Sequence, residues 1–383
     1  MICRAGRRVC RSGLKDCFRR EMRRILLSII LIIALLLSAI PAFAAEAQAA
    51  AGTGAAEDLP ASEAAGELPS GPGASAAGDT VRIAFIDSGI STKHIDPARV
   101  EKGKNYVFPE ADTQDRIGHG TATAGLVLGS EDQGVAGVFP TAAAVPLVVV
   151  DAYPSGAVNN GGPEALTAAI YDAVDLFGCD IINISLSLTE DPDTLRDAVL
   201  YAEIRGVLIV TCAGNDGADG PVYYPAAYDT VVTAGSADGG VCASFSQKGA
   251  DIVTDGTGLT VPSNRNGAAP RKVSGTSYSC ALITGVCARI RAARPNAAPA
   301  EIRGILYSLA EDIGEPGPDP FSGRGYVSPD AEIPGPKTSA KELAGPAAAG
   351  AEAACRALRA MDQRSGAGRL FGLAARIAAA SAQ

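Results

Sequence analysis

Four residues with reactive or hydrogen-bonding side chains stand in short segments rich in glycine and small residues: Asp87, His119, Asn215 and Ser277. A serine hydroxyl becomes a nucleophile when a base removes its proton, and histidine can be that base near neutral pH. A buried carboxylate can fix the histidine tautomer and stabilise the imidazolium. Carbonyl attack creates an oxyanion, which needs fixed donors such as an asparagine amide or an N–H at a helix start. The set predicts acyl transfer with Ser277 as nucleophile and His119 as general base and acid. Asp87 would orient the histidine, and Asn215 would donate to the oxyanion.

Each of these residues has an ordinary structural explanation when it is taken alone. Asp87 follows an apolar run and precedes a glycine turn. Asn215 beside Gly214 fits a left-handed turn, and Ser277 at a helix start fits an N-cap. A lone histidine is commonly structural, which is our prediction for His94, the other of the two histidines in the chain. The four types together favour catalysis, and two histidines exclude a histidine-rich catalytic zinc site.

The chain between residues 80 and 330 alternates apolar β-branched runs with helical patterns. Strands are predicted at 81–86, 144–150, 180–186, 207–212 and 230–235, and helices at 119–128, 164–177, 194–205, 276–293 and 299–309. The alternation predicts an α/β fold with a doubly wound, mostly parallel sheet and helices on both faces. Ligands of such sheets bind outside the carboxyl ends of the strands, where Asp87 and Asn215 stand.

The order of the four residues, with their flanking sequences, resembles the subtilisin-like serine peptidases, the subtilase family. The matching pieces lie within residues 81–327 and include FIDSGI, GHGTATAG, TCAGNDG, ASFSQKG and GTSYSCALITG. The resemblance implies the four roles given above, a polypeptide substrate, and chemistry that needs no cofactor. We therefore interpret the chain as an exported serine endopeptidase that works through an acyl-enzyme.

The resemblance also implies a substrate-binding region. Ser185-Leu186-Ser187 matches the edge segment that pairs with substrate backbone as an added strand. Ala213 and Gly214 would wall the pocket for the residue before the scissile bond. Tyr223 stands where the family often has a tiny residue at the pocket floor. A phenol there would fill volume, which predicts a preference for small substrate side chains such as Ala.

Some features depart from the family pattern. Ala281 replaces the proline that follows the nucleophile, which alters a helix start and no reacting atom. A family calcium loop would fall near residues 129–135, where Glu131 and Asp132 lie, but carbonyl ligands are invisible in sequence and we assign no metal site. Residues 45–79 are too poor in large apolar side chains to form the folding prodomain that is usual in secreted relatives.

The first 44 residues have the pattern of a signal peptide. Residues 1–24 carry a net charge of +7 from nine basic and two acidic residues, and an apolar run of 16 residues follows at 25–40. Small residues at Ala42 and Ala44 predict cleavage after Ala44. Residues 1–21 could be a start-site artefact, because Met22 precedes an ordinary basic stretch. An uncleaved anchor is the alternative, but the run is shorter than the ~20 residues of a spanning helix. We expect secretion, with no stable membrane span after cleavage.

The remaining chain divides by composition. Residues 45–79 are predicted to be a linker, 80–330 the peptidase domain, and 331–383 a Pro/Ala-rich linker with an Ala-rich helical tail. The net charge of −9 argues against nucleic-acid binding, which needs a basic surface. An exported chain permits disulfides, but most of the six cysteines beyond the signal peptide lie in apolar segments and are predicted to be buried hydrophobes. These are Cys179, Cys212, Cys242, Cys280, Cys287 and Cys355.

Two alternative functions compete with the endopeptidase. A catalytically weak peptide-binding protein could share the fold, but it would have no need for the intact set Asp87, His119 and Ser277. An esterase of the α/β-hydrolase type needs G-x-S-x-G and the order serine, acid, histidine, whereas Ser277 comes last here.

The signal-peptide interpretation predicts that the mature chain begins at Ala45. N-terminal sequencing or mass spectrometry of the secreted protein measures this directly. Recovery of a membrane-bound chain that still carries residues 25–40 would favour the anchor instead.

Overall fold

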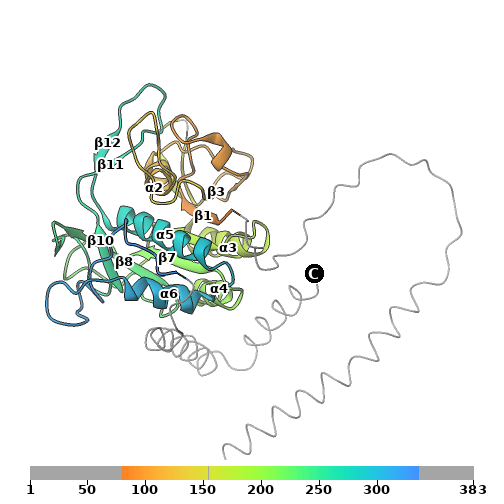
Figure 1. Cartoon of the computed structure of the whole chain (residues 1–383). Helices are drawn as coiled ribbons and strands as arrows, with labels where there is room; N and C mark the ends of the chain where they lie inside the picture. The colour runs from red at the N-terminus through yellow and green to blue at the C-terminus, as the bar shows by residue number, and fades with distance from the viewer. Residues whose placement is uncertain (1–79, 154, 336–383) are drawn as a thin grey trace, which may run out of the picture. The chain divides into compact units, whose positions relative to one another are not determined.

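A central sheet of parallel strands organises the computed structural model, which describes residues 80–153 and 155–335 (Figure 1). Neighbouring strands follow the order β10, β8, β7, β6, β1, β3 and β2, and all these pairs are parallel. Their bounds are β2 Lys104–Asn105, β3 Ala143–Val148, β1 Arg82–Asp87, β6 Ile181–Ile184, β7 Leu208–Cys212, β8 Val232–Asp238 and β10 Ile252–Asp255. The short strand β9 (Val241–Cys242) pairs with β8 in the antiparallel sense.

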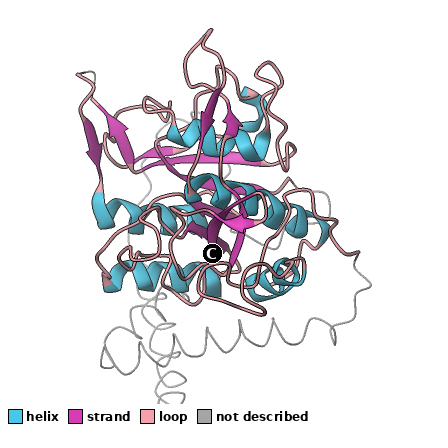
Figure 2. Ribbon diagram, turned by 90° about the vertical axis from the view of Figure 1, so that its left-hand side faces the viewer, coloured by secondary structure: helices cyan, strands magenta, loops and turns pink. Residues whose placement is uncertain are grey.

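Helices cover both faces of this sheet, because the side chains of each strand alternate between two apolar cores (Figure 2). Ile83 and Phe85 of β1 join one core, whereas Ala84 and Ile86 join the other. The first core is completed by α2 (His119–Leu128), α5 (Thr276–Ala293) and α6 (Pro299–Ser308), and the second by α3 (Gly162–Asp175) and α4 (Asp193–Ile204). The predicted doubly wound α/β fold is confirmed.

Smaller elements lie outside the sheet. The 3-10 turn η1 (Pro97–Arg99) follows β1. Two antiparallel hairpins are formed by β4 (Val150–Ala152) with β5 (Val158–Asn160), and by β11 (Leu259–Val261) with β12 (Arg271–Val273). The second hairpin leads directly into α5. No described helix is long and apolar enough to cross a membrane.

The predicted helices lie within two residues of the observed bounds, but β6 is shorter than expected. The strand ends at Ile184, and Ser185 to Ser187 follow it outside the regular strand. Strands β2, β9 and β10 and both hairpins were not predicted, because they are short or carry polar or charged residues.

The first turn of α2 packs closely against the end of β1. A Cβ atom at Gly120 would lie 2.2 Å from the carbonyl oxygen of Gly89. Only glycine permits this approach. The contact fixes His119, the first residue of α2, beside the carboxyl end of β1.

Candidate active site

Asp87 ends β1 as a buried carboxylate, with 1% of its surface exposed. Its Oδ1 accepts hydrogen bonds from the backbone N–H of Ser88 at 2.7 Å and from His119 Nδ1 at 2.8 Å. Its Oδ2 lies 3.0 Å from the same Nδ1 and accepts from the Thr123 hydroxyl at 3.3 Å. A carboxylate with these donors fixes the imidazole with Nδ1 protonated, which leaves Nε2 as the basic nitrogen.

The Asp87 carboxylate stabilises the charged form of His119. The pKa of His119 is raised above its ordinary value of 6.5, chiefly by the negative charge of Asp87, while burial of the ring opposes the rise. The side chain is 30% exposed, so the ring is accessible from one side. A base with a raised pKa is stronger when deprotonated, which suits proton removal from a hydroxyl.

A second buried acid, Asp115, holds the start of α2 in place. Its Oδ1 accepts from the N–H groups of Ile117 and Gly118 and from the Ser88 hydroxyl, at 2.7–2.9 Å. Its Oδ2 accepts from the N–H and the hydroxyl of Thr121, at 2.8 and 2.6 Å. The unpaired N–H groups of a helix start thus receive a charged acceptor. Sequence reasoning missed Asp115, although its position four residues before His119 was a possible signal.

Ser277 is the second residue of α5 and is 8% exposed. Its hydroxyl donates to the backbone carbonyl of Ser185 at 3.4 Å, and its own carbonyl accepts from the Ser185 hydroxyl at 3.0 Å. The Ser277 N–H belongs to the first turn of the helix, where N–H groups have no intrahelical acceptor. The next residue, Tyr278, places its ring 5.7 Å from the His119 ring, centroid to centroid.

Asn215 is tied to the same helix start through its side-chain oxygen. Oδ1 accepts from the N–H of Thr276 at 2.8 Å and from the Thr276 hydroxyl at 3.1 Å. That hydroxyl also accepts from the N–H of Gly214 at 3.2 Å. Because these bonds use the oxygen, the amide NH₂ of Asn215 is left as the group available to an incoming carbonyl oxygen.

Asn183 of β6 links this strand to α5 through its side chain. Sequence reasoning missed this role. The side chain is fully buried and donates to the Ser185 hydroxyl at 3.0 Å. Its Oδ1 accepts from Thr284 at 2.9 Å and from the Cys280 thiol at 3.2 Å. A single asparagine inside an apolar strand was the available signal, because buried amides are kept where they have partners.

The residues predicted to bind substrate lie in the segments around this site. Leu186 is half-buried and packs on the α3–α4 core, and Ser187 is exposed. Ala213 is buried and Gly214 has a φ of +113°. The ring of Tyr223 packs on Gly214, since a Cβ there would lie 2.6 Å from Tyr223 Cδ2, and the Tyr223 hydroxyl donates to Asp216 Oδ2 at 2.6 Å. Tyr223 is therefore next to the predicted pocket wall.

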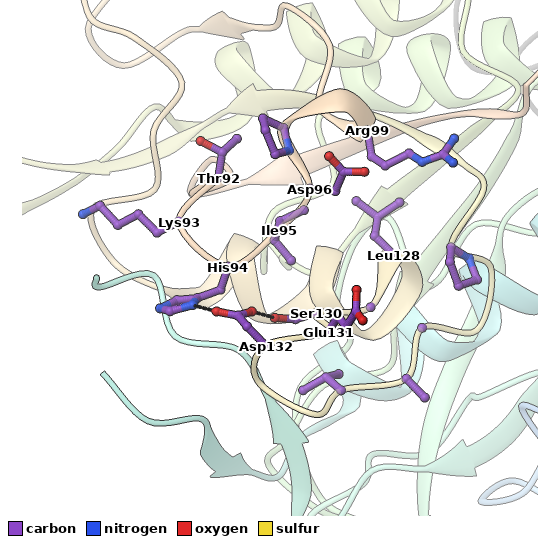
Figure 3. A pocket seen from close by; sticks show the side chains of 16 residues that line it. Thr92, Lys93, His94, Ile95, Asp96, Arg99, Leu128, Ser130, Glu131 and Asp132 are labelled. Carbon is purple, nitrogen blue, oxygen red and sulfur yellow. Dashed lines mark hydrogen bonds and ion pairs between the residues drawn. The ribbon is translucent and has the colours of Figure 1, made fainter. Parts of the chain in front are cut away.

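His94 lies in a separate cavity of about 840 Å³, between the 92–99 and 128–140 segments (Figure 3). Its Nδ1 lies 2.5 Å from Asp132 Oδ2, and its Nε2 lies 2.9 Å from the carbonyl oxygen of Arg265. This agrees with a structural histidine. Asp132 also accepts from the Ser130 hydroxyl. In the described part of the chain, no group of three or more His, Cys, Asp or Glu side chains is arranged to hold a metal ion.

The cysteines of the described residues are free thiols. Four are buried, as predicted, and Cys242 is half-buried. Burial raises the pKa of the Cys212 thiol to about 11 and that of Cys287 to about 12. Cys355 lies outside the described residues, as do the predicted signal peptide, the linker 45–79 and the tail.

The sequence of this chain is similar to that of a known protein family and of several of its members. The model of the subtilase family matches residues 78–325. M-protease of Shouchella clausii (strain KSM-K16) is 34% identical over 239 residues, which are 62% of this chain and 60% of M-protease. Subtilisin DY of Bacillus licheniformis is 31% identical over 259 residues, which are 66% of this chain and 91% of that protein.

Solved structures also match. Fervidolysin from Fervidobacterium pennivorans, a keratinolytic enzyme related to subtilisin, aligns with a TM-score of 0.60 and 30% identity, over 68% of this chain and 44% of that one. The S41 psychrophilic protease aligns with a TM-score of 0.58 and 28% identity, over 66% of this chain and 92% of that protein.

The contact between His119 and Asp87 predicts that His119 titrates above pH 6.5, because the carboxylate favours the imidazolium. Substitution Asp87→Asn removes that charge and should lower the midpoint. NMR titration of histidine-labelled protein measures both values. His94→Gln identifies the His119 signal and should leave its midpoint unchanged. An Asp87→Asn variant with an unshifted midpoint would contradict the pairing.

Proposed function

The chain belongs to the subtilase family of serine endopeptidases, and we propose on that premise that it hydrolyses peptide bonds through an acyl-enzyme on Ser277. The observation that carries the proposal is the pair formed by the buried Asp87 and the half-buried His119, whose imidazole lies beside the residue that follows Ser277. A carboxylate that orients a histidine toward a serine is the arrangement that activates a hydroxyl.

In the proposed reaction, His119 Nε2 takes the proton of Ser277 while Oγ attacks the substrate carbonyl carbon. Asp87 stabilises the imidazolium through Nδ1–H. The oxyanion accepts hydrogen bonds from the Asn215 amide and the Ser277 N–H, which are held by the first turn of α5. Collapse of this intermediate breaks the C–N bond, and His119 protonates the leaving amine. His119 then takes a proton from a water that attacks the acyl carbon. Collapse of this second intermediate breaks the C–Oγ bond, and His119 returns the proton to Ser277 Oγ.

A polypeptide fits this site as a substrate. The edge segment Ser185-Leu186-Ser187 extends beyond β6, and the chain before the scissile bond would pair with it as an added strand. Ala213 and Gly214 would face its side chain, with Tyr223 at the floor of the pocket. The apolar run at 25–40 and the small residues before Ala45 support secretion of the enzyme.

One observation favours a second candidate, a catalytically weak peptide-binding protein on the same fold. Ser277 Oγ donates to the Ser185 carbonyl in this structure, and a hydroxyl held there would be a poor nucleophile. The distance of 3.4 Å makes this a weak bond that a substrate can replace. Catalytic hydrogen bonds also commonly tighten only when the substrate is bound.

Labelling by a serine-directed fluorophosphonate separates the two candidates. The wild type should be labelled covalently and should cleave peptides, whereas Ser277→Ala should lose both and keep its thermal unfolding midpoint. Ser279→Ala is a matched control, because Ser279 belongs to the same helix and bonds to the Asp255 carbonyl and to Ser236. Labelling of that variant should persist. Ser277→Ala turnover close to wild type would overturn the proposal.

Removal of the Asn215 amide should lower kcat by ~10²–10³ with little change in KM, because the donor acts on the oxyanion only. This range is the effect of removing the corresponding oxyanion donor in subtilisin, a member of the same family. Asn215→Asp keeps the oxygen that accepts from Thr276, so it tests the donor apart from the cap. It should lower kcat at least as much as Asn215→Ala. Steady-state kinetics of both variants measure this, and wild-type kcat in Asn215→Asp would refute the donor role.

Tyr223 should limit the size of the side chain before the scissile bond. Tyr223→Gly removes the ring that packs on Gly214, so kcat/KM for Phe or Leu substrates should rise relative to Ala substrates. A few lost or gained methylene contacts correspond to ~1–3 kcal/mol, so the shift should be about 10–200-fold at most. A peptide series that varies only this residue gives the ratios. Identical ratios in both proteins would mean that the ring does not fill the pocket.

A further inference from the structure

Arg271 opens strand β12, and its side chain reaches the start of α2. Nη2 of its guanidinium donates to the carbonyl oxygen of Gly118 at 2.8 Å, and Gly118 directly precedes His119. The residue is exposed. A guanidinium carries five N–H donors in a planar fork, so this bond leaves others available to a ligand.

The charge of Arg271 acts on both rings beside the nucleophile. The charge of Asp87 raises the pKa of His119, and Arg271 opposes that rise. Burial raises the pKa of Tyr278, and Arg271 opposes this rise as well. Since the His119 and Tyr278 rings are neighbours, the three side chains form one group next to Ser277.

Arg271 has no acidic partner within ion-pair distance among the described residues, although the protein has a net charge of −9. Four other described arginines also lack an ion pair, namely Arg99, Arg265, Arg289 and Arg324, whereas seven have one: Arg82, Arg116, Arg196, Arg205, Arg291, Arg294 and Arg303. The guanidinium of Arg271 already bonds to the Gly118 carbonyl and to Tyr278, but without an acidic partner its other N–H donors are available to a carboxylate that arrives with the substrate.

The proposed mechanism indicates which part of the substrate lies near Arg271, so the inference rests on the proposed function. His119 must protonate the leaving amine, so the chain after the scissile bond lies on the His119 side of Ser277. The chain before the bond lies along Ser185-Leu186-Ser187 and Gly214. We propose that Arg271 binds an acidic side chain on the leaving-group side, so that peptides with Asp or Glu in the first two positions after the scissile bond are preferred.

A set of C-terminally amidated peptides tests the proposal. The peptides share one sequence before the scissile bond and carry Glu, Gln or Lys at the first or the second position after it. At one of these positions, kcat/KM for Glu should exceed that for Gln by about threefold to tenfold, and Lys should fall below Gln. The Glu preference should shrink as salt is added, because an exposed charge pair is screened.

Two variants separate recognition from a general charge effect. Arg271→Met should bring the Glu/Gln ratio close to one, and Arg271→Glu should make Lys the preferred residue, which a merely structural role cannot produce. Lys272→Met is the matched control: it removes the same charge from the neighbouring exposed residue of β12, whose side chain points to the opposite face. It should keep the wild-type ratio.

The outcomes are distinguishable from those that test the peptidase itself. Equal rates for Glu, Gln and Lys in the wild type, or the same loss of preference in Lys272→Met and Arg271→Met, would overturn the role of Arg271. A wild type that cleaves none of the peptides would instead overturn the proposed function.

Discussion

The attachment of the first turn of α5 to the carboxyl end of the sheet is the constraint on which the candidate site depends. Asn215 accepts a hydrogen bond from Thr276, the first residue of α5. Asn183 of β6 accepts from Cys280 and Thr284, further along the same helix, and donates to Ser185. Each bond is buried or partly buried, so an unmade partner would carry a desolvation penalty of ~1–3 kcal/mol. The helix therefore has one favourable position, and that position brings Ser277 at its start beside Ser185, which follows the carboxyl end of β6.

Two buried carboxylates near one another have different tasks, and their surroundings explain the division. Asp87 faces an imidazole, which can exchange a proton, whereas Asp115 faces backbone N–H groups and hydroxyls, which cannot. Burial raises the pKa of Asp115, while its hydrogen bonds with Gly118 and Thr121 lower it in opposition. In the proposed mechanism, Asp87 would serve the chemistry, and Asp115 would hold the helix start that carries His119. Loss of Asp87 would remove the direct hydrogen bond to the imidazole, whereas loss of Asp115 would loosen the helix start that carries it.

Sequence reasoning anticipated the parts of the molecule that have a strong pattern. Apolar runs and helical periodicity gave α2 and α5 their observed bounds, and glycine-flanked polar residues marked Asp87, His119, Asn215 and Ser277. It did not anticipate Asp115 or Asn183, because their importance comes from partners distant in the chain or on another element. Arg271 is the same kind of case. An exposed residue in a polar hairpin has no sequence signal, and only the pairing of β11 with β12 carries it to Gly118.

The buried thiols have a consequence for the environments in which this fold can persist. A thiol must ionise before it reacts with an oxidant or exchanges with a disulfide, and a pKa of about 11 or 12, as for Cys212 and Cys287, leaves almost no thiolate at neutral pH. Burial also keeps oxidants away from the sulfur atoms. The described part of the chain uses no disulfide to hold its core, so its stability should be the same under reducing and oxidising conditions.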